Sequence, residues 1–527
     1  MAHLASRRGR RHPALPAGLA LTASLGLLLP AGAASAAPAP LAPAQAAAAS
    51  GTVAGTADGP AMSYVVNVTG GQATAASVKR AIAAAGGTVV IAYDQIGVIV
   101  VHASDPGFAA RIRTVPGVES AGATRTAPLA AQTSDAIAAD QPLTAAEARA
   151  ATARAATSTA DDDPLQPLQW DLPAIKADKA HQRTLGSRSV TVAVLDSGVD
   201  DTHPDIAPNF DRAASASCLG GVPVQKDNAW RPTAEESDHG MHVAGTIAAA
   251  KNGVGVTGVA PGVKVSSLKV AEPATGLYYT EAVVCGFVWA AEHGADVTNN
   301  SYYTDPWLFN CTTDADQKAL VEAVTRASRY AERKGVVNVA AAGNARTDLA
   351  SETVTDKTSP NDTTPVERTI DTRDCFDIPS QLPGVVTVSG TGAQGLKASY
   401  SNYGLGVVDI AAPGGDSTAY QPPQAPATKG GILSTTFRGG HTYAYKSGTS
   451  MASPHVAGVA ALIKSVRPHA TPAQVKALLY ARADAMPCTD PYDIDKNGTV
   501  DAVCEGVTQR NGFYGVGMVD ALDAVRR

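Results

Sequence analysis

Aromatic and charged side chains are scarce in this sequence. Phe, Trp and Tyr make up 5% of its 527 residues, and Asp, Glu, Lys and Arg make up 17%. A disordered, highly charged chain is excluded, because 45% of the residues are hydrophobic and can build a core. The 34 prolines follow no Gly-X-Y period, which excludes collagen. A net charge of −6 lacks the cationic excess of nucleic-acid-binding proteins, so we expect no nucleic-acid partner.

Long apolar runs are also missing. After residue 36, no segment offers about 18 uninterrupted apolar residues, so we expect no stable membrane anchor. Residues 1–36 have the pattern of an export signal: a basic start, an apolar stretch from Leu15 to Leu29, and the cleavage site Ala34-Ser35-Ala36. We therefore predict a secreted, extracellular product.

Cysteine is rare, and its spacing excludes the usual metal motifs. No C-x-x-C and no Cys/His zinc spacing occurs, so zinc is the weaker interpretation. An even number of cysteines in an exported chain favours disulfides, with 15 possible pairings of six. The local pair Cys488–Cys504 is the one we predict. All six follow residue 164: Cys218, Cys285, Cys311, Cys375, Cys488 and Cys504.

The first third of the chain divides into three parts. Residues 37–61 are rich in Ala, Pro and Gly, and we expect them to be disordered. Residues 62–126 predict a compact β-α-β-β-α-β unit, which is a ferredoxin-like motif. Its expected elements are Ser63–Thr69, Thr74–Ala85, Gly87–Tyr93, Gly97–His102, Pro106–Val115 and Val118–Thr124. Residues 127–163 return to Ala, Thr, Ser and Asp, and we expect an exposed, protease-sensitive linker.

Residues 164–527 show a different pattern, in which short Val-rich strands alternate with helices. This alternation predicts an α/β domain with a parallel sheet covered by helices on both faces. Functional side chains should then gather at the carboxyl ends of the strands. The expected strands are Ser189–Leu195, Val263–Val270, Asp296–Ser301, Val336–Ala341, Val385–Ser389 and Val407–Ala411, and the helices span 240–250, 280–293, 315–334 and 450–466.

Three segments of this domain carry side chains suited to nucleophilic catalysis. A strand ends at Asp196 in the segment 192–200, His239 stands at a helix start in 238–246, and Ser450 begins a helix in 447–458. A serine hydroxyl needs an imidazole to accept its proton, and the imidazole needs a carboxylate to fix its tautomer. Pro454 should lie early enough in the last helix to break no helical hydrogen bond.

These segments closely resemble the subtilisin-like serine proteases (the subtilase family) over residues 164–527. The order Asp, His, Ser is that of subtilisin. The resemblance implies a parallel-sheet α/β fold and peptide-bond hydrolysis without a catalytic cofactor. It makes Ser450 the nucleophile, His239 the general base and Asp196 its orienting partner. Alone, each could be a turn or helix-cap residue, but together and in this order they favour a triad. The motif leaves His242 as a structural neighbour.

The resemblance also assigns the groups that would bind the substrate. The segment Ala340 to Asn344 resembles the family's oxyanion segment, which gives Asn344 the role of oxyanion donor together with the Ser450 N–H. Ala341, Ala342 and Gly343 become substrate-binding residues. Ser301, Tyr302 and Tyr303 stand where the family binds extended substrate. The family has a Ser-Leu-Gly segment there, so the two tyrosines depart from it and predict narrower specificity.

A stabilising calcium site is implied by the same resemblance. Its candidate ligands are Gln166, Asp205 and Asn252, whose oxygens suit Ca²⁺. An ordinary polar turn is the alternative. Residues 493–501 match the first half of an EF-hand loop, but Cys504 stands where the closing glutamate is needed, so a turn is at least as good an interpretation.

Residues 62–126 resemble the inhibitor-type propeptide of the family. That resemblance implies a folding chaperone and temporary inhibitor that the enzyme removes by cutting within 127–163; a permanent accessory domain is the alternative. We therefore predict a secreted, monomeric serine endopeptidase, made as a pre-pro-enzyme and acting on proteins or peptides. A narrow-specificity processing protease and a pseudoprotease binding module are the alternatives. A serine esterase is disfavoured, because the segment around Ser450 lacks the second glycine of G-x-S-x-G.

Overall fold

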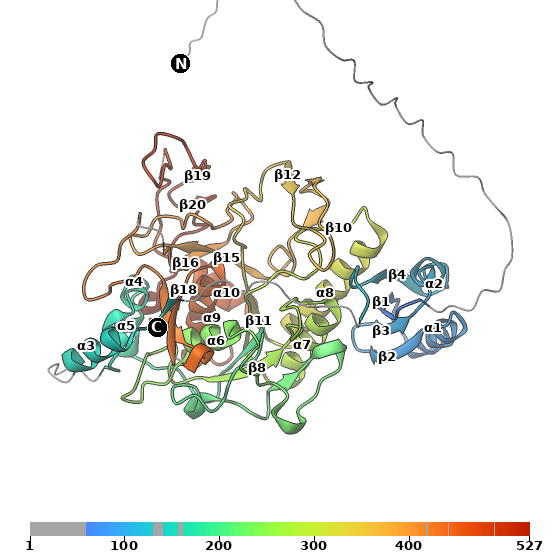
Figure 1. Cartoon of the computed structure of the whole chain (residues 1–527), viewed down its shortest axis with the longest axis horizontal. Helices are drawn as coiled ribbons and strands as arrows, with labels where there is room; N and C mark the ends of the chain where they lie inside the picture. The colour runs from blue at the N-terminus through green and yellow to red at the C-terminus, as the bar shows by residue number, and fades with distance from the viewer. Residues whose placement is uncertain are drawn as a thin grey trace, which may run out of the picture. The chain divides into compact units, whose positions relative to one another are not determined.

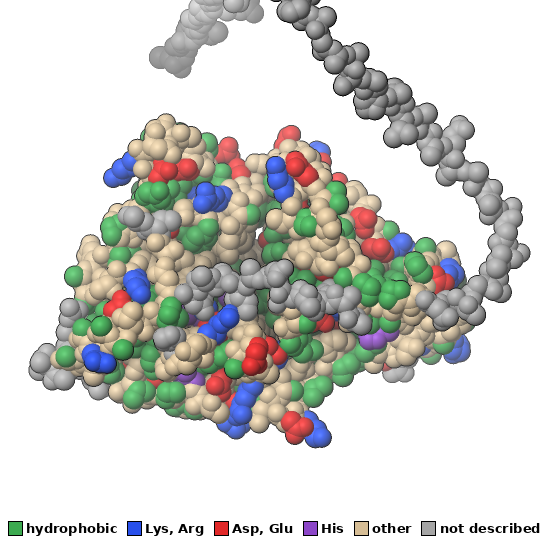
Figure 2. All heavy atoms as spheres, in the orientation of Figure 1, with side chains coloured by type: hydrophobic (Ala, Val, Ile, Leu, Met, Phe, Trp, Pro, Cys, Tyr) green, Lys and Arg blue, Asp and Glu red, His purple; other side chains and the backbone are tan. Residues whose placement is uncertain are grey.

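The computed structural model describes residues 59–129, 141–155, 162–417, 420–440, 442–489 and 491–526 (Figure 1). The expected signal peptide, nearly all of the segment 37–61 and parts of the linker lie outside these residues. Among the described helices, none is both long and apolar enough to cross a membrane. On the face drawn in Figure 2, Lys and Arg side chains are interspersed with Asp and Glu, so the charge of that face is mixed.

A seven-stranded parallel sheet forms the centre of residues 164–527, as the alternating pattern predicted. Its strand order is β16-β15-β11-β9-β6-β8-β7. The strands are β6 (Thr191–Asp196), β7 (Ala216–Ser217), β8 (Lys264–Lys269), β9 (Val297–Asn300), β11 (Val337–Ala341), β15 (Val386–Thr391) and β16 (Ile410–Pro413). Every residue of β6 is buried, which is expected of a strand covered on both faces.

Helices cover both faces of this sheet, and the two-residue period of β6 explains how. Val192 and Val194 pack with α6 (His239–Ala248) and α9 (Thr449–Val466). Ala193 and Leu195 pack with α7 (Thr280–Glu292) and α8 (Ala315–Arg333). Successive side chains of a strand point to opposite faces, so one strand supplies both cores. The expected α/β fold class is confirmed.

The N-terminal unit, residues 59–129, has the expected β-α-β-β-α-β order. Its antiparallel sheet has the order β2-β3-β1-β4. One side of this sheet packs with the unit's own helices through Tyr64, Ile82 and Phe108. Residues of the other side, Val65 and Val98 among them, pack with α7 and α8. The elements are β1 (Met62–Val68), α1 (Gln72–Ala84), β2 (Thr88–Tyr93), β3 (Val98–Ala103), α2 (Phe108–Ile112) and β4 (Val118–Ala123).

The described parts of the segment 127–163 contain secondary structure that its composition did not predict, although most of residues 141–153 are exposed, as expected of a linker. Residues Gln141–Pro142 form β5, which pairs with β18 (Tyr443–Lys446), and Ala145–Ala155 form α3. Thr144 and Glu147 cap this helix reciprocally: each backbone N–H donates to the other's side chain, at 2.9 and 3.2 Å. Leu143 is buried against Leu433 and Tyr445. A capping box hidden in an alanine-rich stretch therefore creates structure where composition indicated none.

Pro454 lies inside α9, five residues after its start, so the expectation that it breaks no helical hydrogen bond is wrong. A residue with an N–H at this position would donate to the carbonyl of Ser450 four residues earlier. That carbonyl instead accepts the Ser301 hydroxyl, at 3.0 Å. The proline thus leaves an acceptor at the start of α9 that the end of β9 satisfies.

The remaining elements are short and surround the sheet. They comprise the helices α4 (Asp171–Ala174), α5 (Ala177–His181), α10 (Pro472–Ala481) and α11 (Ala521–Ala524); the strands β10 (Asn310–Cys311), β12 (Thr353–Asp356), β13 (Arg368–Asp371), β14 (Cys375–Phe376), β17 (Ile432–Thr435), β19 (Gly506–Val507) and β20 (Arg510–Asn511); and the 3-10 turns η1 (Gln166–Leu168), η2 (Ala207–Asn209), η3 (Leu219–Gly221), η4 (Lys226–Asn228) and η5 (Arg438–Gly440).

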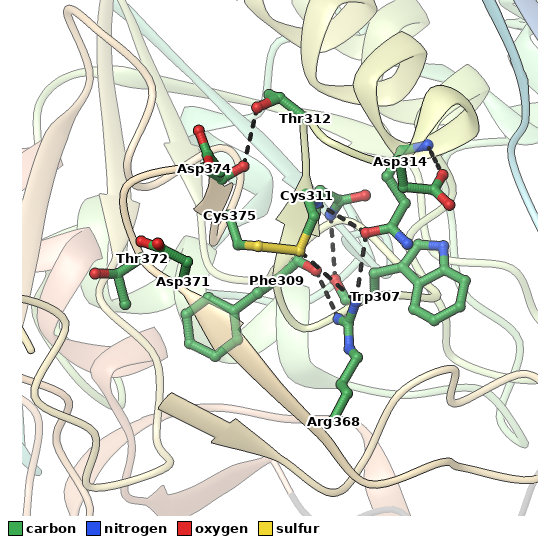
Figure 3. The surroundings of a disulfide bond; sticks show 12 residues. Trp307, Phe309, Cys311, Thr312, Asp314, Arg368, Asp371, Thr372, Asp374 and Cys375 are labelled. Carbon is green, nitrogen blue, oxygen red and sulfur yellow. Dashed lines mark hydrogen bonds between the residues drawn. A yellow bond between two sulfur atoms is a disulfide. The ribbon is translucent and has the colours of Figure 1, made fainter. Parts of the chain in front are cut away.

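Three disulfides pair all six cysteines. Cys488–Cys504 is the predicted pair, and Cys218–Cys285 and Cys311–Cys375 are the others. Cys311–Cys375 joins β10 to β14 (Figure 3). Beside it, the Arg368 guanidinium donates to the Phe309 carbonyl at 2.6 Å and lies 4.8 Å over the Trp307 ring. Disulfides suit an exported protein.

Candidate active site

Asp196 and His239 meet where β6 ends and α6 begins. The His239 Nδ1 lies 2.8 Å from one Asp196 carboxylate oxygen and 3.0 Å from the other. The carboxylate is buried and also accepts the Ser197 N–H at 2.7 Å and the Tyr278 hydroxyl at 3.2 Å. With Nδ1 held by the carboxylate, the imidazole has Nε2 left for a substrate-side proton.

Ser450 is the second residue of α9 and lines the same cavity of about 600 Å³ as His239. Its hydroxyl donates to the Ser301 carbonyl at 3.1 Å, while the Ser301 hydroxyl donates to the Ser450 carbonyl at 3.0 Å. Ser450 and His239 make no hydrogen bond to one another in this structure, so the hydroxyl must leave Ser301 to reach the imidazole. Such contacts often tighten only when substrate is bound.

Asn344 stands beside the start of α9 with one side of its amide already engaged. Its Oδ1 accepts the Thr449 N–H at 2.8 Å and the Thr449 hydroxyl at 2.9 Å. This leaves Nδ2 as a donor in the cavity that Ser450 also lines. A Cβ built on Gly448 would lie 3.5 Å from that Nδ2 and 3.7 Å from the Ser450 nitrogen. The two predicted oxyanion donors therefore flank one glycine.

Replacing Asn344 with leucine should lower kcat for peptide hydrolysis by about 10²–10³-fold, the effect known from subtilisin, and leave KM nearly unchanged. The leucine has a similar volume but supplies no donor where negative charge develops. Steady-state kinetics on one peptide substrate measure both constants. Asn402→Leu is unsuitable as a control, because Asn402 accepts the Ala345 and Thr347 N–H groups and so orients the loop after Asn344. Asn209, which is buried but does not line the cavity, is the control: Asn209→Leu reports general destabilisation. A proportional rise in KM with constant kcat would contradict the oxyanion role.

His242 lies one turn after His239, yet it is in a different environment. It is fully buried, and its Nε2 lies 2.9 Å from the Ile432 carbonyl and 3.1 Å from that of Ala444. Burial, with the charge of Lys446, lowers the pKa of His242 to about 3. A neutral imidazole that donates to two strand carbonyls is a structural group, as the motif suggested.

The predicted substrate-binding residues lie around the cavity, with one exception. Ser301, Tyr302, Tyr303, Ala341 and Gly343 line it. Ala342 is fully buried behind the wall, where its N–H donates to the Val388 carbonyl at 2.9 Å and its carbonyl accepts the Asn402 amide at 2.8 Å.

The cavity residues that sequence reasoning missed include Tyr278, Asp305, Asn361 and Asp377. The ring of Tyr278 stacks on that of Tyr302, with centroids 4.5 Å apart. Asn361 donates to the Tyr303 hydroxyl at 2.9 Å and to Asp305 at 2.7 Å. Each of these four residues lies in an irregular segment. Neither a motif with fixed spacing nor the periodicity of a helix or strand could therefore reveal them.

Gln166, Asp205 and Asn252 converge on the loop of residues 252–257. Gln166 Oε1 accepts the Thr257 hydroxyl at 2.9 Å, and Asp205 Oδ2 accepts the Val256 N–H at 3.0 Å. The other Asp205 oxygen is buried and has no hydrogen-bond partner among the described residues. Burial raises the pKa of Asp205 to about 7. An orphaned carboxylate oxygen and two side-chain amides around the same loop supply the kind of oxygen ligands that fit Ca²⁺.

The EF-hand-like segment brings a second group of carboxylates together. Oxygens of Asp493, Asp495 and Asp501 lie within 4.8 Å of one another. Gly498 donates its N–H to Asp493 at 2.8 Å, so the segment closes on itself as a turn. Exposed acidic groups of this kind are common in proteins, and the arrangement fits either interpretation of the motif.

Comparisons with known proteins agree with this geometry. The model of the subtilase family matches residues 187–517. Subtilisin Savinase from Lederbergia lenta is 31% identical over 327 residues, which are 62% of this chain and 95% of that protein. Fervidolysin from Fervidobacterium pennivorans is 30% identical over 347 residues, 62% of this chain and 41% of its own. The solved structure of the epidermin leader peptide processing serine protease EpiP from Staphylococcus aureus has a TM-score of 0.61 at 22% identity and covers 88% of this chain and 98% of that one.

Proposed function

This chain belongs to the subtilase family and is a subtilisin-like serine endopeptidase, and from that premise we propose that Asp196, His239 and Ser450 are its catalytic triad. The observation that carries the proposal is the Asp196–His239 hydrogen bond of 2.8 Å at the edge of the cavity that Ser450 and Asn344 line. Proteins or peptides are its substrates. A role as a pseudoprotease is disfavoured, because every group that the chemistry needs is present.

The reaction follows from the positions of these groups. The Ser450 hydroxyl attacks the carbonyl carbon of the scissile bond while Nε2 of His239 accepts its proton. The negative charge on the former carbonyl oxygen is stabilised by the Asn344 amide and the Ser450 N–H, and Asp196 stabilises the imidazolium. The C–N bond then breaks as His239 returns the proton to the departing amine. Water, activated by His239 in the same way, releases the acyl group from Ser450.

The proposal extends to how the enzyme is made. Residues 62–126 act as an inhibitor and folding chaperone, and the enzyme cuts itself free within 127–163 after export. The contact of Val65 and Val98 with α7 and α8 supports this role, because it buries apolar surface between the two parts. Slow formation of the parallel sheet gives a chaperone its purpose. The three disulfides are consistent with a secreted product.

The proposed function is tested with purified precursor and casein. We expect the precursor to shorten, with the new N-terminus between residues 127 and 163, and casein fragments to accumulate. A fluorophosphonate probe should label one peptide, at Ser450. If neither casein nor the precursor is cut and Ser450 stays unlabelled, the protein is not the peptidase proposed here.

We propose that Gln166, Asp205 and Asn252 hold a structural calcium ion. Saturating Ca²⁺ should then raise the free energy of unfolding by about 3–4 kcal/mol, the gain expected at 100 to 1,000 times the dissociation constant. The measurement is the melting temperature of the mature enzyme with Ca²⁺ and with a chelator. Asp205→Asn should abolish the difference, whereas Asp493→Asn should preserve it. If only Asp493→Asn abolished the Ca²⁺-dependent difference in melting temperature, the ion would instead bind at the EF-hand-like turn.

A further inference from the structure

The active-site cavity has an acidic wall that catalysis does not use. Besides His239 and Ser450, its lining includes Asp305, Asn361 and Asp377. Asp377 directly precedes the Ile378–Pro379 peptide and is almost completely buried. A Cβ built on Gly343 would lie 3.4 Å from Asp377 Oδ2. The Asp377 carboxylate therefore sits next to the residue that precedes the oxyanion donor Asn344.

The two carboxylates differ in how they are satisfied. Asp305 accepts the Asn361 amide at 2.7 Å through one oxygen and the Tyr278 N–H through the other. Asp377 Oδ1, by contrast, is buried without any hydrogen-bond partner among the residues that the structure describes, and so is Asn361 Oδ1. A buried acceptor without a donor is costly, and an unpaired carboxylate is more so.

The one Lys or Arg side chain that lines the cavity is paired with a carboxylate other than these two. Lys446 is the one Lys or Arg among its lining residues, and its ammonium lies 2.8 Å from Asp238. Burial raises the pKa of Asp377 well above its usual value, and the charge of Asp305 adds to the rise. The tyrosines that line the cavity, Tyr278, Tyr302 and Tyr303, supply no positive charge, and burial raises the pKa of each of them. A cation entering the pocket would oppose that rise and favour the ionised carboxylate.

We propose that this pocket receives a lysine or arginine side chain of the substrate residue immediately before the scissile bond, and that Asp377 determines this specificity. The proposal rests on the proposed function of the same site and names its substrate class.

The geometry connects the pocket to that substrate residue. The carbonyl under attack must lie with its oxygen at Asn344, and the side chain of the same residue then enters the space beside Gly343, where Asp377 lies. Lysine and arginine carry only donors, whereas the two buried side-chain oxygens of this wall that lack a donor, Asp377 Oδ1 and Asn361 Oδ1, are acceptors. The methylene stem of either side chain can pack along apolar lining such as Ala341 and Leu308.

The experiment uses mature wild-type enzyme and peptide substrates that differ only in the residue before the cut: Arg, Lys, Gln, Met or Glu. Active enzyme is counted by fluorophosphonate labelling. We expect kcat/KM for Arg and Lys to exceed that for Met by about 10²-fold or more, with Glu the poorest. Asp377→Asn, which is nearly isosteric, should lower the ratio of kcat/KM for the Arg substrate to kcat/KM for the Met substrate by at least about tenfold.

Two controls keep the outcome decisive. Asp371→Asn removes an exposed charge of the same sign, paired with Arg373 away from the cavity, and should leave the preference intact. Benzamidine should inhibit wild-type cleavage of the Met substrate at a concentration at least tenfold lower than its neutral counterpart benzamide, a test that needs no variant to fold. Equal kcat/KM for Arg and Met, equal inhibition by the two compounds, or a preference that survives in folded Asp377→Asn would overturn the proposal. These outcomes differ from the result expected if the protein is not a peptidase, because none of the five peptide substrates would then be cleaved.

Discussion

Replacing Ser450 with alanine is expected to lower kcat for casein or peptide cleavage by about 10⁶-fold, the loss known for the serine of subtilisin, and to leave the chain at precursor size. The hydroxyl is the only atom of the Ser450 side chain that can form the acyl-enzyme, and alanine lacks it. Activity assays and gel electrophoresis of the purified variant measure the two losses.

Ser465→Ala provides the matched control for this variant. Ser465 also lies on α9, but its hydroxyl donates to the Ala461 carbonyl at 2.7 Å and is not part of the cavity. This variant should mature and cleave casein at nearly the wild-type rate. The absence of fluorophosphonate labelling in the Ser450→Ala preparation would exclude a contaminating serine protease. If this preparation still retained more than a small fraction of the wild-type activity, Ser450 would not be the nucleophile.

Replacing Arg125 with methionine should weaken the binding of the N-terminal unit to the rest of the enzyme by several hundred-fold. Arg125 is 4% exposed, donates to Glu281 at 2.8 Å and lies 3.8 Å over the Tyr279 ring. Burial raises the pKa of Glu281, but Arg125 outweighs it and holds that pKa below its usual value. Without Arg125, Glu281 is a buried, unpaired charge, which costs about 3–5 kcal/mol.

The measurement for Arg125→Met is the dilution at which the cut but still associated N-terminal unit releases active enzyme. We expect release at a protein concentration several hundred times higher than for wild type. Lys79→Met is the control, because Lys79 pairs with Asp94 on the exposed surface within the N-terminal unit and should change little. An unchanged release concentration for Arg125→Met would mean that the buried ion pair does not hold the unit.

The sequence predicted most of the framework, for physical reasons that particular residues illustrate. Strand β6 is buried on both faces, so its Val-rich pattern was visible, and its end placed Asp196 at the sheet edge. His239 and Ser450 stand at helix starts, where polar residues interrupt apolar patterns. Cys488–Cys504 is local, which made it predictable, whereas Cys218–Cys285 joins residues 67 positions apart.

The features that the sequence could not predict are those set by contacts between segments that lie far apart in the chain. Asp305 and Asp377 are brought to the same cavity by irregular segments, so neither spacing nor periodicity relates them. Tyr278, whose ring stacks on that of Tyr302, donates its hydroxyl to Asp196 across 82 residues of sequence. The helix of residues 145–155 was hidden because alanine is equally typical of low-complexity segments, and it is the burial of Leu143 that fixes it on the enzyme.

The proline of α9 ties together two sequence positions that might otherwise vary separately. Because Pro454 supplies no N–H, the Ser450 carbonyl depends on the Ser301 hydroxyl, a partner 149 residues away in the chain. Alanine at position 301 would orphan that carbonyl unless position 454 also regained a donor. In the evolution of this enzyme, the identity of the residue at the substrate edge and the proline of the nucleophile's helix are therefore expected to covary, so that neither is exchanged without its counterpart.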